Sequence, residues 1–175
     1  MATYYSTTVA SAQGTTFDNQ FRFPVGLSHG RVRVTTGVAE SVAGSLDLAA
    51  LDVVVVGVVK ATDRFMAEIS FGDGGEDTAA QTFDVGLYER AETGSLGAVA
   101  DSDCFDVGSA FGVTAGIGFG SATENHVGKQ FWEIAGAASA EAAPEHYYVT
   151  LSTGTSAFDA ADYRFGAAVL YTSGD

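Results

Sequence analysis

The run Val53-Val54-Val55-Val56-Gly57-Val58-Val59 is the stretch that decides the fold class of this chain. Two further strand-like runs follow it, Arg64–Gly72 and Thr82–Tyr88, and the acidic glycine turn Asp73–Asp77 separates them. Short runs of valine and phenylalanine that are broken by Gly and Asp are typical of β-strands. A wholly apolar run is expected where a strand is buried on both faces. The segment therefore predicts three strands with an acidic loop at one rim of the sheet.

The composition of the whole chain agrees with an all-β fold. Its 175 residues fit one domain, and a hydrophobic fraction of 46% is enough for a core. Only 17% of the residues are charged and 22 are glycine, which favours strands joined by tight turns over a helical protein. We predict a single-domain β-sandwich or jelly-roll-like antiparallel barrel with little helix over residues 21–175. Residues 1–20 are predicted to form an N-terminal arm or an edge strand, with simple disorder as the alternative.

An alternating segment precedes the valine run. Arg31–Thr36 repeats apolar and polar residues with a period of two. This pattern predicts that Val32 and Val34 face inward, whereas Arg31 and Arg33 face water or a partner.

The second half of the chain mixes strand-like runs with segments rich in small residues. Gly94–Asp103 is predicted to be a loop, and Lys129–Ile134 a short strand or a helical turn. The runs 146–153 and 162–171 are predicted to pair with each other and to close the fold.

The net charge of −14, from 22 acidic residues against eight Lys and Arg, limits the possible partners. It repels the phosphates of DNA and RNA and the anionic surface of a membrane, so neither is an expected partner. It favours either simple solubility or a partner with a basic or mixed-charge docking face. No secretory signal is visible, and the longest apolar run falls far short of the ~18 residues of a transmembrane helix. We therefore expect synthesis in a cytoplasm without export or membrane insertion.

Two glycine motifs resemble catalytic or cofactor-binding loops. Gly26–Gly30 matches the nucleophile-elbow pattern G-x-S-x-G, but an alternating strand follows it where that motif needs a helix. A turn between strands explains the same residues, and a hydrolase would rest on Ser28 and His29 alone. Gly116–Gly120 lacks the third glycine of a dinucleotide loop, because position 121 is serine. No catalytic residue and no cofactor is therefore predicted.

Acidic residues surround the single cysteine, Cys104. The carboxylates of Asp101, Asp103 and Asp106 should raise the pKa of its thiol, which predicts a structural cysteine rather than a nucleophile. This acidic segment and the turn Asp73–Asp77 could each bind a hard cation such as Ca²⁺, although neither has EF-hand spacing. The three histidines form no pair at metal-ligand spacing. No metal site is predicted, and a cation at one of the acidic loops stays open.

Six residues are candidate contacts to a partner protein. They come from the aromatic N-terminal segment, the alternating segment and the largest local aromatic pair: Tyr4, Tyr5, Phe17, Arg31, Arg33 and Trp132. Large aromatic side chains dominate protein cores, so the pair Phe131-Trp132 is expected in the core. If Trp132 is exposed instead, it is the first candidate for an anchor at an interface.

The order of these patterns resembles the head decoration, or capsid cement, proteins of tailed bacteriophages. The resemblance is carried by Asp52–Gly57, Thr82–Tyr88, Val99–Asp103 and Tyr163–Tyr171. It implies a β-rich virion protein without catalytic residues that sits on the outer surface of the capsid. It also implies a homotrimer that clamps the major capsid protein after synthesis in the cytoplasm of the host bacterium.

The alternative is a receptor- or glycan-binding β-sandwich of a virion fibre or spike. Exposed rings of Trp132 and of the pair Tyr147-Tyr148 would favour it, because sugars stack on aromatic faces. The two functions differ in whether the aromatic side chains are available at the surface.

Overall fold

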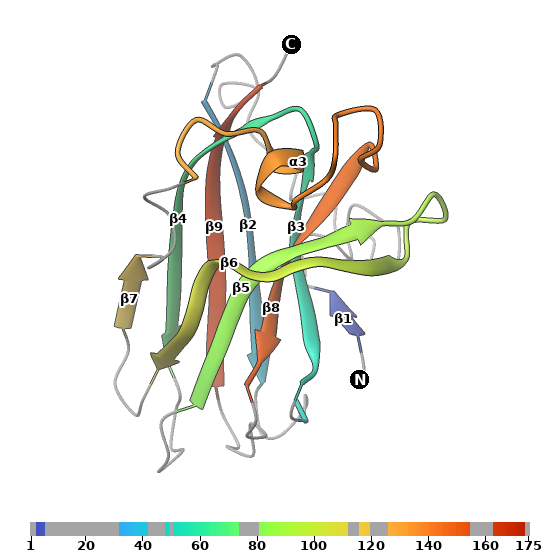
Figure 1. The fold of residues 1–175 in the computed structure, drawn as a ribbon. Helices are drawn as coiled ribbons and strands as arrows, with labels where there is room; N and C mark the ends of the chain where they lie inside the picture. The colour runs from blue at the N-terminus through green and yellow to red at the C-terminus, as the bar shows by residue number, and fades with distance from the viewer. Residues whose placement is uncertain are drawn as a thin grey trace, which may run out of the picture.

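The computed structural model describes residues 3–5, 32–41, 48–49, 51–73, 81–111, 116–119, 126–154 and 163–173. These residues form two β-sheets that face each other, and a single helical turn among them lies at one end of the sheets (Figure 1). This arrangement confirms the prediction of an all-β sandwich with little helix. The predicted division of the chain at residue 20 stays a prediction.

Each sheet mixes strands from distant parts of the chain. The order in the five-stranded sheet is β1 (Thr3–Tyr5), β3 (Val53–Lys60), β8 (His146–Thr153), β5 (Gln81–Arg90) and β6 (Leu96–Phe111). The order in the four-stranded sheet is β2 (Val32–Ser41), β9 (Tyr163–Thr172), β4 (Arg64–Asp73) and β7 (Gly116–Phe119). β1 runs parallel to β3, and the other pairings of these strands are antiparallel.

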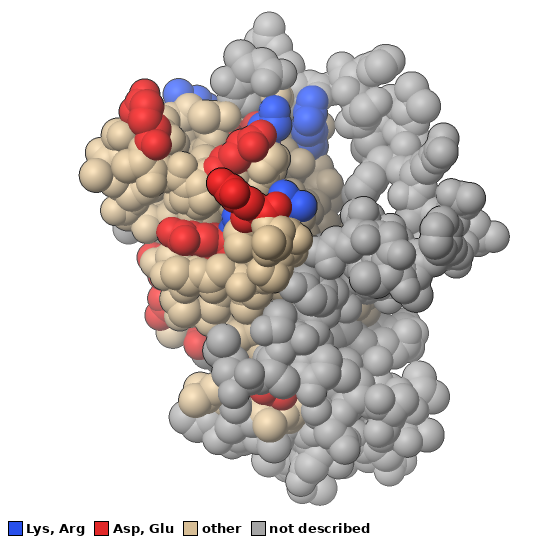
Figure 2. Space-filling view, turned by 90° about the vertical axis from the view of Figure 1, so that its right-hand side faces the viewer, with Lys and Arg blue, Asp and Glu red and all other residues tan. Residues whose placement is uncertain are grey.

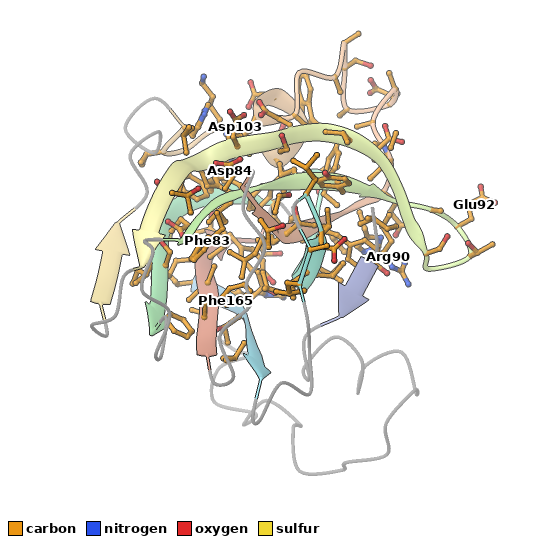
Figure 3. The ribbon with its side chains drawn as sticks, turned by 90° about the horizontal axis from the view of Figure 1, so that it is seen from below. Phe83, Asp84, Arg90, Glu92, Asp103 and Phe165 are labelled. Atoms are coloured by element: carbon orange, nitrogen blue, oxygen red, sulfur yellow. The ribbon has the colours of Figure 1, made fainter. Side chains whose placement is uncertain are left out.

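The core lies between the two sheets and is apolar and aromatic. Val53 to Val56 of β3 are at most 1% exposed, which confirms that this strand is buried on both faces. Phe83 of β5 and Phe165 of β9 meet between the sheets, with their ring centroids 5.3 Å apart (Figure 3). Such aromatic pairs add to the stability that burial of their area already supplies.

The helical turn α3 (Phe131–Ile134) closes the end of the sandwich at which β3 ends and β4 begins (Figure 1). Phe131 is fully buried, and its ring centroid lies 6.3 Å from that of Phe65 and 6.2 Å from that of Phe105. The turn begins with a capping box, in which the backbone N–H of Gln130 donates to the Glu133 carboxylate at 2.7 Å. Of the two structures predicted for this segment, the helical turn is confirmed.

The prediction of a loop over Gly94–Asp103 is wrong, because β6 begins at Leu96 and continues to Phe111. β6 ends the strand order of its sheet, and its pairing with β5 shifts register repeatedly. A strand of this kind can contain small and acidic residues for two reasons. One of its edges lacks a neighbouring strand in this sheet, and β-bulges interrupt its pairing with β5. The same residues gave the segment its loop-like composition.

The predicted pairing of the last two strands is also wrong. β8 lies between β3 and β5, whereas β9 lies between β2 and β4 in the other sheet. Alternation in a sequence determines which face of a strand is buried, but it does not determine the neighbouring strand. Connections that cross between the two sheets are common in sandwiches with Greek-key topology.

The buried face of β2 is the opposite of the predicted one. Val32 and Val34 are 45% and 36% exposed, whereas Thr35 is buried. Thr35 faces β3, and its Oγ1 accepts a hydrogen bond from the backbone N–H of Val58 at 3.3 Å. Gly57 permits this approach, because a Cβ at that position would lie 2.0 Å from Thr35 Oγ1. Close contact between β2 and β3 therefore selects small inward residues and turns the valines outward.

Candidate interaction surface

Four of the six predicted contact residues belong to the N-terminal part of the chain. Tyr4 and Tyr5 lie in β1, whose backbone pairs with β3 at one edge of the five-stranded sheet. Phe17 and Arg31 lie outside the described residues. The structure therefore places the two tyrosines on a sheet edge and leaves their role as contacts a prediction.

Arg33 and Trp132 lie at the same end of the sandwich, the end closed by α3. Arg33 is exposed near the start of β2, and Trp132 is half-buried with its side chain packed against the core. The indole Nε1–H donates a hydrogen bond to Oε1 of Gln130 at 2.7 Å. Trp132 is thus part of the helical turn that closes this end of the sandwich. It is neither fully buried in the core nor fully exposed, so neither of the two predicted positions describes it completely.

Four titratable side chains gather where β6 meets the loop before α3: Asp101, Asp103, Cys104 and His126. Burial is the main cause that raises the pKa of the Cys104 thiol, and Asp101 and Asp103 raise it further. Burial also lowers the pKa of His126, and Lys129 adds to this effect. The prediction that Cys104 is buried is confirmed, since it is 4% exposed. A thiol held in its protonated form is a poor nucleophile, which supports the predicted structural role. Among the described residues, no group of three acidic, histidine or cysteine side chains has a geometry that could hold a metal ion.

A second polar cluster is buried between the two sheets. Ser70 Oγ of β4 donates a hydrogen bond to Oδ2 of Asp106 in β6 at 3.1 Å. Glu68, two residues earlier on β4, is 2% exposed. These side chains are closed off from solvent, and the Ser70–Asp106 hydrogen bond joins the two sheets.

A β-bulge explains why sequence reasoning missed this cluster. The pairing of β4 with β9 shifts register between Phe65 and Ala67, and this shift inverts the alternation of the strand beyond it. Glu68 then points into the sandwich, whereas Ile69 and Phe71 point outward and are half-buried. Without the bulge, the same sequence would bury its apolar residues and expose the glutamate.

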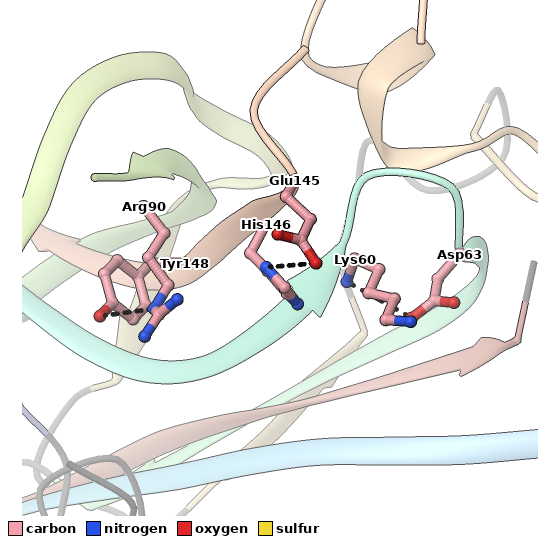
Figure 4. A network of polar contacts seen from close by, with 6 residues as sticks. All are labelled: Lys60, Asp63, Arg90, Glu145, His146 and Tyr148. Carbon is pink, nitrogen blue, oxygen red and sulfur yellow. Dashed lines mark hydrogen bonds and ion pairs between the residues drawn. The ribbon is translucent and has the colours of Figure 1, made fainter. Parts of the chain in front are cut away.

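The aromatic pair Tyr147-Tyr148 is buried, with exposed fractions of 1% and 0%. The Tyr148 hydroxyl donates to the carbonyl oxygen of Gly94 and accepts a hydrogen bond from Arg90 Nε at 3.2 Å (Figure 4). These bonds hold the turn between β5 and β6 against β8. These two rings are therefore unavailable for stacking on a sugar. Of the three aromatic side chains that would favour a glycan-binding protein, the half-buried Trp132 is the one that remains partly accessible.

The sequence motifs are only partly within the described residues. Gly26–Gly30, with Ser28 and His29, lies outside them, and so does Gly74–Asp77 of the first acidic loop. Gly116–Phe119 forms β7 and pairs with β4, so this segment is a strand and not the start of a dinucleotide-binding loop. Within the described part of the chain, we find no helix with the length and apolar character needed to cross a membrane.

The exposed side chains of β2 and β4 near α3 form a surface of their own. They are apolar or basic, and we name them the valine–arginine patch: Val32, Val34, Arg64 and Met66. The pairing places them together, since Thr172 of β9 pairs with Val32 on one side and with Arg64 on the other. Arg33 lies between the two valines on β2 and points to the opposite face, because it pairs with Tyr171, which in turn pairs with the buried Phe65. On the face shown in Figure 2, Lys and Arg side chains lie toward the upper end, whereas acidic side chains extend further down.

Acidic side chains mark the opposite sheet. Asp103 of β6 is exposed, and the neighbouring Asp101 is half-buried, with its pKa raised by burial and by its hydrogen bond to Asp103. Figure 3 shows Asp103, Asp84 and Glu92 on the side of the molecule that β5 and β6 form. Among the residues whose side chains the structure describes, Arg64 is thus the charged residue of the valine–arginine patch, whereas β6 carries the carboxylates of Asp101 and Asp103.

Comparison with known proteins identifies a shared fold. No family model and no curated protein matches the chain. A chain of the solved structure "Capsid of Ralstonia phage GP4" is 16% identical, with a TM-score of 0.62 over 99% of both chains. A chain of "Cyanophage Pam1 capsid asymmetric unit" is 14% identical, with a TM-score of 0.53 over 90% of this chain and 96% of the other. The chain therefore shares its fold, along nearly its whole length, with chains found in two phage capsids.

Proposed function

We propose that this chain is a structural protein of a phage virion that decorates the outer surface of the head. In this role it binds the major capsid protein, associates with itself as a homotrimer and stabilises the shell. It is made in the cytoplasm of the host bacterium and acts by adhesion, without catalysis, a cofactor, nucleic acid or a membrane. The observation that carries the proposal is the fold shared over 99% of both chains with a chain of the Ralstonia phage GP4 capsid.

The physical properties of the chain support an adhesive role. The two sheets enclose a core of fully buried aromatic and aliphatic side chains, and such close-packed interiors transmit force with little deformation. A net charge of −14 keeps separate copies soluble and repels packaged DNA. A rigid, acidic sandwich suits a protein that must bind the outside of a shell and not its contents.

Stabilisation of the shell follows from mass action. A protein that binds the assembled shell, but not its separated subunits, stabilises it by about 2.7 kcal/mol per site when its free concentration is about 100 times the Kd. Linked copies engage several sites at once, so weak individual contacts give strong attachment.

A thermal rupture assay tests the proposal. Undecorated heads of the phage that encodes this chain are heated with increasing amounts of the purified protein, and DNA release is followed by the fluorescence of a DNA-binding dye. We expect the rupture temperature to rise and then saturate, and the protein to sediment with the heads. An unrelated acidic protein of similar size is the control and should leave the rupture temperature unchanged. The proposal is refuted if this chain neither sediments with the heads nor changes their rupture temperature.

A further inference from the structure

The turn before β3 holds a leucine in a backbone conformation that favours glycine. The backbone N–H of Asp52 donates to the carbonyl oxygen of Ala49 at 3.2 Å, so Leu51 occupies the third position of a β-turn that starts at Ala49. Leu51 has a φ of 65°, and β-turns with a positive φ at that position take Gly or Asn there. Its side chain is nevertheless large, apolar and 62% exposed. The turn therefore carries a side chain that its backbone does not favour.

Glycine occupies the comparable positions elsewhere in the described part of the chain. Apart from Leu51, the described residues with a positive φ are Gly94, Gly128 and Gly136. The turn at 126–129 is built in the same way, since Lys129 N–H donates to the carbonyl oxygen of His126 at 3.0 Å and Gly128, with a φ of 84°, is the third residue. That turn also exposes an apolar side chain, Val127 at 61%, but at its second position, where φ is not positive. The chain can thus expose an apolar side chain on a turn without strain, and at Leu51 it does not.

Hydrogen bonds hold the turn of Leu51 in this conformation. The Asp52 carboxylate accepts a hydrogen bond from the backbone N–H of Ala49 at 3.0 Å. Thr153 Oγ1 of β8 donates to the carbonyl oxygen of Ala49 at 2.8 Å and accepts from the N–H of Asp52 at 2.8 Å. The N–H of Leu51 itself donates to the carbonyl oxygen of Gly154 at 3.2 Å. A strained backbone persists where its surroundings determine it in this way, so the leucine is held at a fixed position.

The side chain of Leu51 does little for the fold. It is 62% exposed, so it buries little apolar surface, and a left-handed conformation is unfavourable for leucine relative to Gly or Asn. The hydrogen bonds of the turn come from backbone groups and from the side chains of Asp52 and Thr153, so they do not require leucine. Strained residues of this kind cluster at functional sites. The turn therefore indicates that the leucine contacts something outside its own chain.

We propose that Leu51 is an anchor that inserts into an apolar pocket of the shell protein to which the chain binds. The turn precedes β3, so it lies at the end of the sandwich opposite to the end that α3 closes (Figure 1). A contact there reaches what lies beyond the end of the sheets and does not involve their outer faces, which a neighbouring copy can contact. The inference rests on the proposed function, because it names a surface by which the chain holds the shell.

The surroundings of Leu51 define the chemistry of the partner pocket. Ala49 is exposed on the same turn, whereas Asp52 is 3% exposed. The turn therefore offers an uncharged, apolar contact in a chain whose net charge is −14. Full burial of a leucine side chain strengthens binding by about tenfold or more. Salt screens contacts between exposed charges, so we expect the contribution of Leu51 to binding to be the same at about 0.05 M and about 0.5 M sodium chloride.

Binding to undecorated phage heads, measured together with thermal unfolding of the full-length chain, tests the inference. We expect Leu51→Asn to raise the Tm by about 2–4 °C, because Asn accepts the left-handed conformation. The same variant should weaken co-sedimentation with the heads at least about tenfold, because the anchor is lost. Leu51→Met keeps an apolar side chain and should bind with nearly the wild-type affinity. Val127→Asn is the matched control, since Val127 is about as exposed but lies in the turn before α3, and it should leave binding unchanged.

The results separate this inference from the proposed function. If the wild-type chain binds heads and Leu51→Asn binds them equally well, the anchor is refuted and the decoration function stands. A lower Tm for Leu51→Asn would assign the leucine to the fold, and a changed oligomeric state in sedimentation velocity would assign it to a contact between copies. Either of these results overturns the inference. A wild-type chain that does not bind heads refutes both proposals.

Discussion

Replacement of Gly57 by alanine perturbs the contact at which β2 and β3 join the two sheets. The new Cβ would lie 2.0 Å from Thr35 Oγ1 and 3.0 Å from Thr35 Cβ, so Thr35 must move. Overpacking of this kind costs about 1–3 kcal/mol, and loss of the hydrogen bond from Val58 N–H adds about 1 kcal/mol. We expect Gly57→Ala to lower the free energy of unfolding by about 2–4 kcal/mol. For a chain of this length, such a loss corresponds to a decrease in Tm of about 5–15 °C.

A double-mutant cycle with Thr35→Ala isolates the clash. Thr35→Ala alone should cost about 1 kcal/mol, because Val58 N–H loses its acceptor. In that background Oγ1 is absent, so Gly57→Ala should cost only about 1 kcal/mol. Urea unfolding of the four proteins with a common m-value then gives a coupling energy of about 1–3 kcal/mol. If instead the costs of the two single substitutions add to within about 0.5 kcal/mol, the close approach of Thr35 to Gly57 is not the reason that alanine is unfavourable at position 57.

Two further perturbations test the hairpin contact and the buried thiol. Tyr148→Phe removes the hydroxyl that bonds Gly94 and Arg90, so we expect a loss of about 1–2 kcal/mol and faster hydrogen exchange in the turn at 91–95, with β9 unchanged as the internal reference. Alkaline pH should destabilise the chain through Cys104, because a pKa that is higher in the folded than in the unfolded state gives stability that is present at low pH and is lost as pH rises. From about pH 9 upward, the free energy of unfolding should fall by up to about 1.4 kcal/mol per pH unit more in the wild-type chain than in Cys104→Ala; equal slopes would show that the thiol does not titrate on unfolding.

The sequence predicts those parts of the fold that depend on composition and local pattern. The valine run of β3 is buried as expected, because no polar residue interrupts Val53–Val59. Cys104 is buried among acidic neighbours, and the direction of its pKa shift follows from the residues beside it, although burial is the larger cause. These features depend on residues that are close together in the sequence, so the sequence of a single chain is enough to predict them.

Features that depend on distant partners could not be predicted in this way. The separation of β8 and β9 into different sheets is decided by the strands on either side of each, β3 and β5 for β8, and β2 and β4 for β9. The long strand β6 tolerates small and acidic residues because of its edge position, which its sequence does not reveal. The buried hydrogen bond between Ser70 and Asp106 depends on a bulge in β4 whose position no turn residue marks.

The two strands on which the apolar pattern is inverted belong to the same sheet. On β2 the valines Val32 and Val34 point outward, and on β4 the bulge turns Ile69 and Phe71 outward. The causes differ, since β2 is inverted by its close approach to Gly57 and β4 by its bulge. Exposed apolar surface forgoes about 25 cal/mol per Å² relative to burial, and departures from the local pattern are expected at functional sites. Two unrelated inversions that turn apolar side chains to one outer face therefore make this face a candidate for contact with another protein.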